Sequence, residues 1–249
     1  MSYKYGAVSD GILFLKLHLK SQTGKACGRI EIESFELLAP HDEVARDAET
    51  VCFLCNPNPE WVWLKNEHFF VIMALGPVVK GMSIVASTEH TRSMFDVNPT
   101  LLPSLLNLTN QAIAHLEEMY KLPVHVTEHG RVGLCEIIGR SYDPHCIHAH
   151  RLLFPANVDL KTQLSNSDIE PIVVSDFNEA KARAGHLIEY LYYESPAGEI
   201  SVGAMTEAVP RQFFRSAVAH EIGRPELTSW RTTTGSESLA SEAKKLRTL

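Results

Sequence analysis

Hydrophobic and polar positions alternate along much of this 249-residue chain, and the alternation predicts several β-strands. Residues 29–38 and 124–128 alternate with a period of two, which is the period of a strand with one face buried. Two apolar, β-compatible runs at 68–75 and 82–86 are separated by glycine and proline, which indicates two strands joined by a loop. A further strand is predicted at 147–154. The pattern therefore predicts a sheet.

A helical period replaces this alternation between Pro99 and Pro123. The stripe consists of Leu102, Leu105, Leu106, Ile113, Leu116 and Tyr120. A shorter helix is expected to open at Ser175-Asp176 and end near Gly185, and another to run from Pro210 to Gly223. Between these two helices, 187–193 and 199–202 flank Ser195-Pro-Ala-Gly198 like a β-hairpin.

The length suits one large domain with additions, because domains usually hold about 100–200 residues. We expect an N-terminal extension at 1–50, a core at 51–156 and a C-terminal αβ extension at 157–232 that packs on the core. The segment 233–249 is rich in Ser, Glu and Lys and is expected to be a flexible tail.

The composition, 45% hydrophobic and 21% charged, is that of an ordinary globular protein. A formal net charge of -7 provides no overall basic field for a duplex backbone, so extended nucleic acid is not an expected partner. The first residues lack an apolar signal core, and no run of about 18 apolar residues occurs. We therefore expect no membrane partner and a cytoplasmic location.

Five cysteines are an odd number, which argues against a disulfide framework and for free thiols or metal ligands. Cys52 and Cys55 have the C-x-x-C spacing that lets two thiolates converge on one tetrahedral ion, and zinc prefers sulfur and nitrogen donors. Two alternatives remain for this pair. It could be a redox pair, or two small, half-buried side chains of the core.

His148 and His150 lie two residues apart on the strand predicted at 147–154. The period of two sends both imidazoles to one face, together with Cys146 and Leu152, while Arg151 points the other way. One imidazole can then bind a metal while its neighbour stays free. The alternative is that one or both are ordinary core or surface histidines.

Three segments in this order resemble the histidine-triad (HIT) superfamily, including its galactose-1-phosphate uridylyltransferase branch. The first is Cys52-Phe-Leu-Cys55, the second is the strand pair from Pro77 to Val85 followed by Thr88-Glu-His90, and the third is His148-Ala-His-Arg-Leu-Leu-Phe-Pro155. The resemblance covers roughly residues 52–155. It implies an α+β fold, an antiparallel sheet with helices packed on one face, and a homodimer.

The same resemblance implies a structural zinc ion and a nucleophile. The implied zinc ligands are Cys52, Cys55, His90 and His148. The implied nucleophile is His150, the middle histidine of the triad, and the third triad position is Leu152, where the family has a polar residue. In a second register Cys146, His148 and His150 fill the triad, which makes His148 the nucleophile. The distance from His148 to Pro155 favours the first register.

A looser resemblance, to bacterial HIT proteins with an E-H-G loop and a C-terminal aromatic-Arg helix, suggests residues that contact the substrate. Glu128 and His129 are expected to contact ribose or orient the catalytic imidazole, and Arg211 or Arg215 to hold a phosphate. Lys80 and Arg140 are further cationic candidates. For each of these residues the alternative is a solvated surface position.

The resemblance thus implies a nucleotidyl hydrolase or transferase whose substrate is a nucleotide or a nucleotide sugar. A neutral imidazole attacks the α-phosphorus, a phosphate or sugar phosphate departs, and the nucleotidyl-histidine intermediate then reacts with water, phosphate or a sugar phosphate. Two alternatives stay open. One is a zinc-stabilised nucleotide-binding protein with little or no transferase activity, and the other is a zinc hydrolase with His150 among its ligands and one position open.

Overall fold

The computed structural model of the chain describes residues 15–20, 31–37, 52–131, 148–206, 209, 212–229 and 236–248. The chain divides into two units, Met1–Thr50 and Val51–Leu249. In the first unit, β1 (Leu15–Lys20) and β2 (Glu31–Leu37) form an antiparallel pair. The strand predicted at 29–38 is confirmed by β2.

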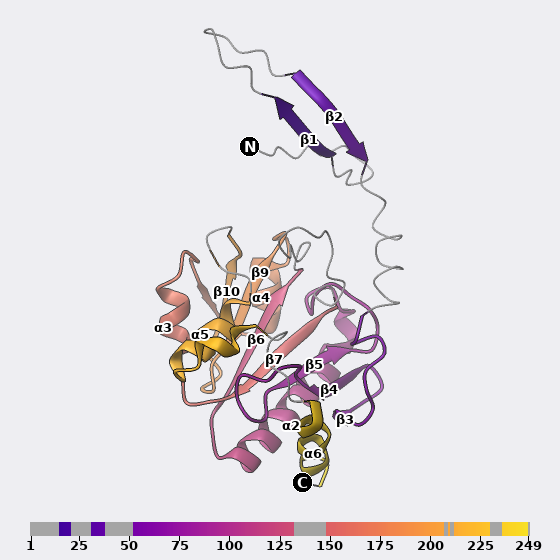
Figure 1. Cartoon of the computed structure of the whole chain (residues 1–249), viewed down its shortest axis with the longest axis vertical. Coiled ribbons are helices and arrows are strands. Elements are labelled where there is room, and N and C mark those ends of the chain that lie inside the picture. Colours follow the sequence, from indigo (N-terminus) through magenta and orange to yellow (C-terminus); the bar gives the residue numbers. More distant parts are fainter. Residues whose placement is uncertain are drawn as a thin grey trace. The chain divides into compact units, whose positions relative to one another are not determined.

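The second unit contains an eight-stranded sheet in the order β3-β4-β5-β7-β6-β9-β10-β8 (Figure 1). The strands are β3 (Val62–Lys65), β4 (Phe69–Met73), β5 (Ser83–Ser87), β6 (Val124–Gly130), β7 (His150–Pro155), β8 (Ile172–Val174), β9 (Tyr190–Glu194) and β10 (Ile200–Ala204). Each neighbouring pair is antiparallel. The predicted α+β class is confirmed. Because β8, β9 and β10 continue the same sheet, the segment 157–232 is part of one layer with the predicted core.

Helices join and cover these strands. They are η1 (Pro99–Leu101), α2 (Leu102–Tyr120), α3 (Leu160–Ser165), α4 (Phe177–Ala184), α5 (Phe213–Glu221), η3 (Pro225–Thr228) and α6 (Ser236–Leu246). Pro103 lies in the first turn of α2, where a missing N–H costs no hydrogen bond. Asp176 caps α4 by accepting a hydrogen bond from the Glu179 amide. Among the described residues, no helix has the length and apolar character needed to cross a membrane.

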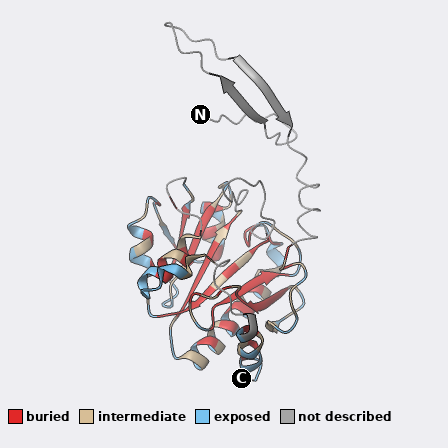
Figure 2. Cartoon of the chain, viewed as in Figure 1, coloured by how far each residue is buried: buried red, intermediate tan, exposed pale blue. Residues whose placement is uncertain are grey.

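The two faces of the sheet carry separate apolar cores, and burial is concentrated on the strands (Figure 2). Helices α2, α4 and α6 pack on one face, called the α2 face, and helices α3 and α5 pack on the other, called the α5 face. Helix α2, which belongs to the predicted core 51–156, lies on one face as expected, and α3 and α5 on the other face belong to the segment 157–232. Phe70, Ile72, Ile84 and Phe154 point to the α5 face, and burying these large apolar side chains requires a second layer of helices.

The segment 236–248, part of the stretch expected to be a flexible tail, contains helix α6 in the structure. Leu239, Ala243 and Leu246 recur at helical spacing and are buried in the core of the α2 face. The Tyr120 hydroxyl donates to Glu242 at 2.5 Å, and the Arg247 guanidinium donates to the Val62 carbonyl at 2.6 Å. Three apolar residues among many polar ones anchor the helix in the core. The polar composition of the segment as a whole gave no indication of them.

A chain that ends at residue 235 is expected to be less stable than the full chain by roughly 3–6 kcal/mol. Fully burying one leucine contributes about 1.5–3 kcal/mol, and α6 buries Leu239 and Leu246. Urea unfolding followed by circular dichroism measures this difference. Lys244→Ala, at an exposed position of the same helix, is the control and should leave the midpoint unchanged. An unchanged midpoint for the truncated chain would contradict the role given to α6.

Candidate functional site

Two cysteines and two histidines from three separate segments meet at one end of the central strands. Cys52 and Cys55 precede β3, His90 follows β5, and His148 precedes β7, which is antiparallel to β5. Their donor atoms all lie within 4.8 Å of one another. The sequence-predicted ligand set therefore comes together in space.

Two of the donor spacings match the edges of a tetrahedron around one ion, and the spacing between His90 and Cys55 is shorter. His148 Nδ1 lies 3.6 Å from Cys52 Sγ and 3.5 Å from Cys55 Sγ, and His90 Nδ1 lies 2.9 Å from Cys55 Sγ. A tetrahedron with metal–ligand lengths of 2.0–2.3 Å has edges of roughly 3.3–3.8 Å. Two thiols and two imidazoles are the donor types that zinc takes in closed structural sites. The residues present thus fit a four-coordinate zinc ion.

Backbone hydrogen bonds bring the ligand segments together. The Cys55 amide donates to the Cys52 carbonyl at 3.1 Å, which forms the turn of the C-x-x-C segment. The Ala149 amide donates to the Thr91 carbonyl at 2.6 Å, which ties the residue after His148 to the residue after His90. Both histidine-bearing segments are therefore held against each other by the main chain.

Ser87, at the end of β5, fixes the orientation of the His148 ring. His148 Nε2 lies 2.7 Å from the Ser87 carbonyl oxygen, and because a carbonyl only accepts, Nε2 carries the proton. Nδ1 is then unprotonated and faces the two sulfur atoms. Burial, together with the neighbouring His90 and His150 rings, lowers the pKa of His148 to about 4. The imidazole is therefore neutral near pH 7 and available as a ligand.

His150 begins β7 and points to the α5 face. Its strand neighbours alternate as predicted, since Leu153 belongs to the core of the α2 face and Leu152 packs against the core of the α5 face. His150 Nδ1 donates to the His148 carbonyl at 2.7 Å, which leaves the lone pair on Nε2. Burial lowers the pKa of His150, and the nearby His129 ring adds to the shift. The ring is half-buried and presents a neutral Nε2.

His129 lies beside His150 on the neighbouring strand. The register of β6 and β7 pairs Thr127 with Leu152, and its continuation places His129 opposite His150 on the same face. His129 Nε2 lies 3.3 Å from the Glu189 carboxylate, which precedes β9. The structure thus places a His–Glu pair next to His150, and no pattern in the sequence indicated Glu189.

Glu128 is directed to the opposite face, so the expectation that it meets the substrate together with His129 does not fit the structure. Its Oε1 accepts from the Met94 amide at 2.8 Å and from the Tyr190 hydroxyl at 2.6 Å, and its Oε2 lies 3.6 Å from Arg151 Nε. Burial raises the pKa of Glu128 although Arg151 opposes the shift. Neighbours in a strand point to opposite faces, so Glu128 and His129 cannot share one pocket.

Arg151 is buried on the α2 face, directly behind the His150 position. Its guanidinium stacks between the rings of Phe177 at 4.7 Å and Tyr192 at 4.6 Å and pairs with Glu128. Stacking on two aromatic faces and an ion pair offset part of the cost of burying this charge. The Glu128–Arg151 pair joins β6 to β7 beneath His150.

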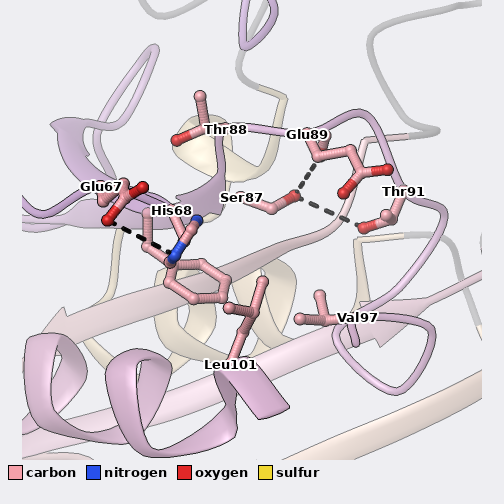
Figure 3. A pocket seen from close by; sticks show the side chains of 9 residues that line it. Glu67, His68, Ser87, Thr88, Glu89, Thr91, Val97 and Leu101 are labelled. Carbon is pink, nitrogen blue, oxygen red and sulfur yellow. Dashed lines mark hydrogen bonds and ion pairs between the residues drawn. The ribbon is translucent and has the colours of Figure 1, made fainter. Parts of the chain in front are cut away.

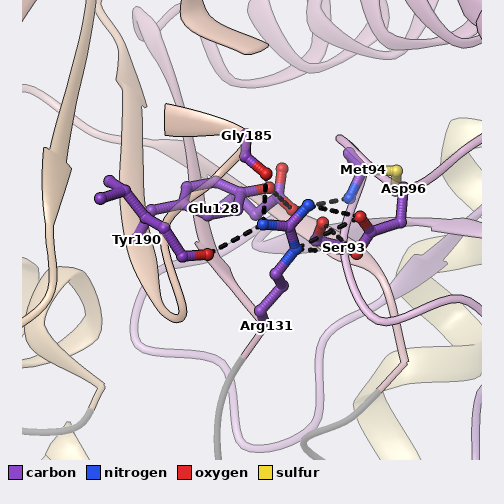
Figure 4. Close-up of polar contacts among 8 residues, drawn as sticks. Ser93, Met94, Asp96, Glu128, Arg131, Gly185 and Tyr190 are labelled. Atoms are coloured by element: carbon purple, nitrogen blue, oxygen red, sulfur yellow. Dashed lines mark hydrogen bonds and ion pairs between the residues drawn. The ribbon is translucent and has the colours of Figure 1, made fainter. Parts of the chain in front are cut away.

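A second polar network anchors the segment that follows His90 (Figure 4). Arg131, at the end of β6, donates to the Asp96 carboxylate at 2.5 Å and to the carbonyls of Gly185 and Leu187 at 2.6 and 2.8 Å. Although burial acts against it, the Arg131 guanidinium holds the pKa of Asp96 below its usual value. Together with the Glu128–Met94 bond, these contacts fix 93–96 to the sheet.

Replacing Arg151 with methionine is expected to lower the free energy of unfolding by about 3–5 kcal/mol, because the substitution leaves the Glu128 carboxylate buried without its partner. The double variant R151M/E128Q should recover part of this loss. Denaturant unfolding measures both. R183M, which breaks an exposed pair with Glu179, is the matched control and should unfold like the wild type. Equal stability of R151M and wild type would contradict the pairing.

The predicted cationic substrate contacts have different outcomes. Arg215 on α5 is buried, and its guanidinium donates to the carbonyls of Gly76, Leu227 and Thr228, so it joins parts of the fold rather than facing His150. Burial lowers its pKa to about 10. Lys80 is exposed in the loop between β4 and β5. Arg140 and Arg211 lie outside the described residues.

A cavity of about 260 Å³ is lined by residues from the end of β5 and the segment that follows it, together with Phe69 and Val97 of the core on the α2 face (Figure 3). Glu67, His68, Glu89 and Thr91 line it, with Phe69 on its apolar side. Ser87 lines it as well, and the Ser87 hydroxyl lies 3.2 Å from His148 Nε2. This cavity is therefore separated by the sheet from the face that His150 presents.

Three solved structures illustrate what this fold is similar to. A yeast Ap4A phosphorylase in complex with AMP aligns at a TM-score of 0.38 and 12% identity, covering 76% of this chain and 71% of that one. A Hit-like protein from Bartonella henselae gives 0.32 and 12%, with coverages of 41% and 73%. A Zn-bound histidine triad family protein from Mycobacterium smegmatis gives 0.28 and 11%, with coverages of 80% and 98%. No family model and no curated protein matches the sequence. At these similarities, function has to be inferred from the side chains themselves.

Proposed function

We propose that this protein is a HIT-type nucleotidyl hydrolase or transferase that acts through a nucleotidyl-histidine intermediate on His150. The observation that carries the proposal is the geometry of that ring. Its Nδ1–H is bonded to the His148 carbonyl at 2.7 Å, which leaves an unprotonated Nε2 on a half-buried ring at the α5 face. A neutral imidazole nitrogen held in one orientation is the nucleophile that such a transfer requires.

The Cys/His cluster supports the first of the two registers. His148 is engaged by the cluster through Nδ1 and by Ser87 through Nε2, so both of its ring nitrogens are committed. Only His150 retains a nitrogen directed away from the cluster. His148 is therefore a ligand, and His150 is the nucleophile.

Zinc is the metal we propose for this cluster, and its role is structural. Cys52, Cys55, His90 and His148 would complete four coordination positions, which leaves none for water or substrate. A bound ion would supply a rigid link between the C-x-x-C turn and the two histidine segments. Two hydrogen bonds, between Ser87 and His148 and between His148 and His150, would then hold the proposed nucleophile in one orientation. This arrangement argues against the zinc hydrolase with an open position.

His129 is the substrate contact that the geometry supports best. Paired with Glu189 and adjacent to His150, it would contact the phosphoryl oxygens as His150 attacks the α-phosphorus. Lys80, Arg140 and Arg211 stay proposals for contacts with outer phosphates. The acceptor is water, phosphate or a sugar phosphate, and nucleotides, dinucleoside polyphosphates and nucleotide sugars are the substrate classes to test.

Leu152 favours a second candidate function, a nucleotide-binding protein with little or no transfer. It occupies the third triad position and has no hydrogen-bond donor, and losing one donor to a developing oxyanion costs about 2.7–4 kcal/mol of activation free energy. Such a protein would keep the fold and the Cys/His cluster but turn over slowly.

Mass spectrometry of the intact protein after incubation with the three substrate classes distinguishes the two functions. The proposal predicts a covalent mass increase of one nucleotidyl group, mapped to His150 after digestion. Samples are quenched in base, since the P–N bond of a phosphoramidate is cleaved by acid. Saturable nucleotide binding without any covalent mass would favour the binding protein instead.

A further inference from the structure

Thr127 lies at the centre of β6, on the same face as His150. It is paired with Leu152 on β7 and with Tyr193 on β9, and none of its surface is exposed. Its Oγ1 has no hydrogen-bond partner among the described residues. Buried hydroxyls in folded proteins are nearly always bonded, because a buried polar group without a partner destabilises the fold. The Thr127 hydroxyl is an exception, and Thr127 lies two residues before His129 on β6.

The neighbouring groups on this face leave the hydroxyl available. His125 Nε2 donates to the Ala156 carbonyl at 3.2 Å, so His125 Nδ1 accepts, and the Tyr193 hydroxyl donates to it at 3.1 Å. The single hydroxyl proton of Tyr193 is therefore engaged in the hydrogen bond to His125. Leu152, the other cross-strand neighbour, has no polar atom. Within the part of the chain that the structure describes, the Thr127 O–H remains a donor without an acceptor.

The position of this hydroxyl matches the donor that the third triad position lacks. Residues directly opposite each other on antiparallel strands have Cβ atoms about 4.5–5.5 Å apart, and Thr127 is directly opposite Leu152. The next outward pair on the same face is formed by His129 and His150. Solvent reaches this region, because His129, His150 and Leu152 are half-buried although β6 and β7 are central strands.

We propose that the Thr127 hydroxyl is a substrate-contacting donor that binds a non-bridging oxygen of the phosphoryl group transferred to His150. The inference rests on the proposed nucleotidyl transfer. In this inference Thr127 on β6 makes the hydrogen bond that a polar side chain at position 152 on β7 would otherwise make. Binding of a phosphate oxygen would also satisfy the buried hydroxyl.

Thr127→Val tests this inference, because it removes the hydroxyl and keeps the shape. The single-turnover rate of nucleotidyl transfer to His150 should fall on the order of 100-fold. The unfolding midpoint should be equal to or above that of the wild type, since the lost hydroxyl had no partner. Thr127→Ser should stay within tenfold of the wild-type rate. In the T127V background, L152Q should restore part of the rate, which a purely structural residue would not allow.

Thr109→Val is the matched control. Thr109 is buried on α2, and its hydroxyl donates to the Leu105 carbonyl at 2.9 Å, so T109V should unfold more easily but transfer at the wild-type rate. If the wild type forms the adduct and T127V forms it equally fast, the Thr127 inference is overturned and the proposed function stands. If the wild type forms no adduct, calorimetry with AMP decides: at least tenfold weaker binding by T127V supports the contact, and equal or absent binding overturns it.

Discussion

His150→Ala is expected to lower the rate of nucleotidyl transfer by at least about 10⁴-fold while the protein remains folded. In the proposed reaction the lone pair of His150 Nε2 is the attacking electron pair, and an alanine side chain has none. His129, the neighbouring imidazole, directs its Nε2 to Glu189 and so does not take over the attack. The measurement is the covalent mass of the protein under single-turnover conditions, together with the rate at which the leaving group appears.

His186→Ala is the control for this substitution, because His186 is exposed and lies outside the site. Its transfer rate should equal that of the wild type. H129A should keep the adduct but form it more slowly, since His129 contributes a donor and not the nucleophile. If H150A still carries the nucleotidyl group, another residue is the nucleophile, and the register that assigns attack to His148 becomes the alternative.

Periodicity predicted the long elements of the fold and missed those that depend on partners. The helical stripe before Pro123 corresponds to α2, and the run at 147–154 overlaps most of β7, because each has enough residues to show its period. Strand β8 has only three residues, and two of them, Ile172 and Val173, are exposed. It exists because β10 supplies its hydrogen bonds, and no local pattern reveals that pairing.

The candidate site was likewise predictable from the sequence only in part. The four donors of the Cys/His cluster were predictable because their segments resemble known motifs in order and spacing. The partners that orient the histidines were not, since each depends on strand register across a long stretch of chain. Ser87 meets His148 across 61 residues, and Glu189 meets His129 across 60. The alternation of β6 was visible in the sequence, and it already implied that Glu128 and His129 point to opposite faces.

Removing the proposed zinc ion is expected to unfold the second unit rather than merely to inactivate it. Cys55→Ser should fail to bind zinc and should lower the melting temperature by more than roughly 10 °C. Structural zinc binding contributes apparent free energies of about 10–16 kcal/mol, and a loss of about 4 kcal/mol alone shifts the midpoint of a 150–250-residue protein by roughly 8–16 °C. Metal content by mass spectrometry and thermal unfolding by circular dichroism measure the two effects.

Cys146→Ser is the control that separates the two registers. The described residues already supply four ligands from Cys52, Cys55, His90 and His148, so C146S should keep its zinc and its melting temperature. Zinc lost from C146S would instead favour the register in which Cys146 fills the first triad position.

Chelation of the proposed ion tests its role in the reaction. If chelation abolishes turnover while the unfolding transition stays in place, the ion acts on substrate or water. Unfolding together with loss of metal is the result that a closed site of two thiolates and two imidazoles requires, since the ion joins three chain segments that otherwise depend on a few backbone hydrogen bonds.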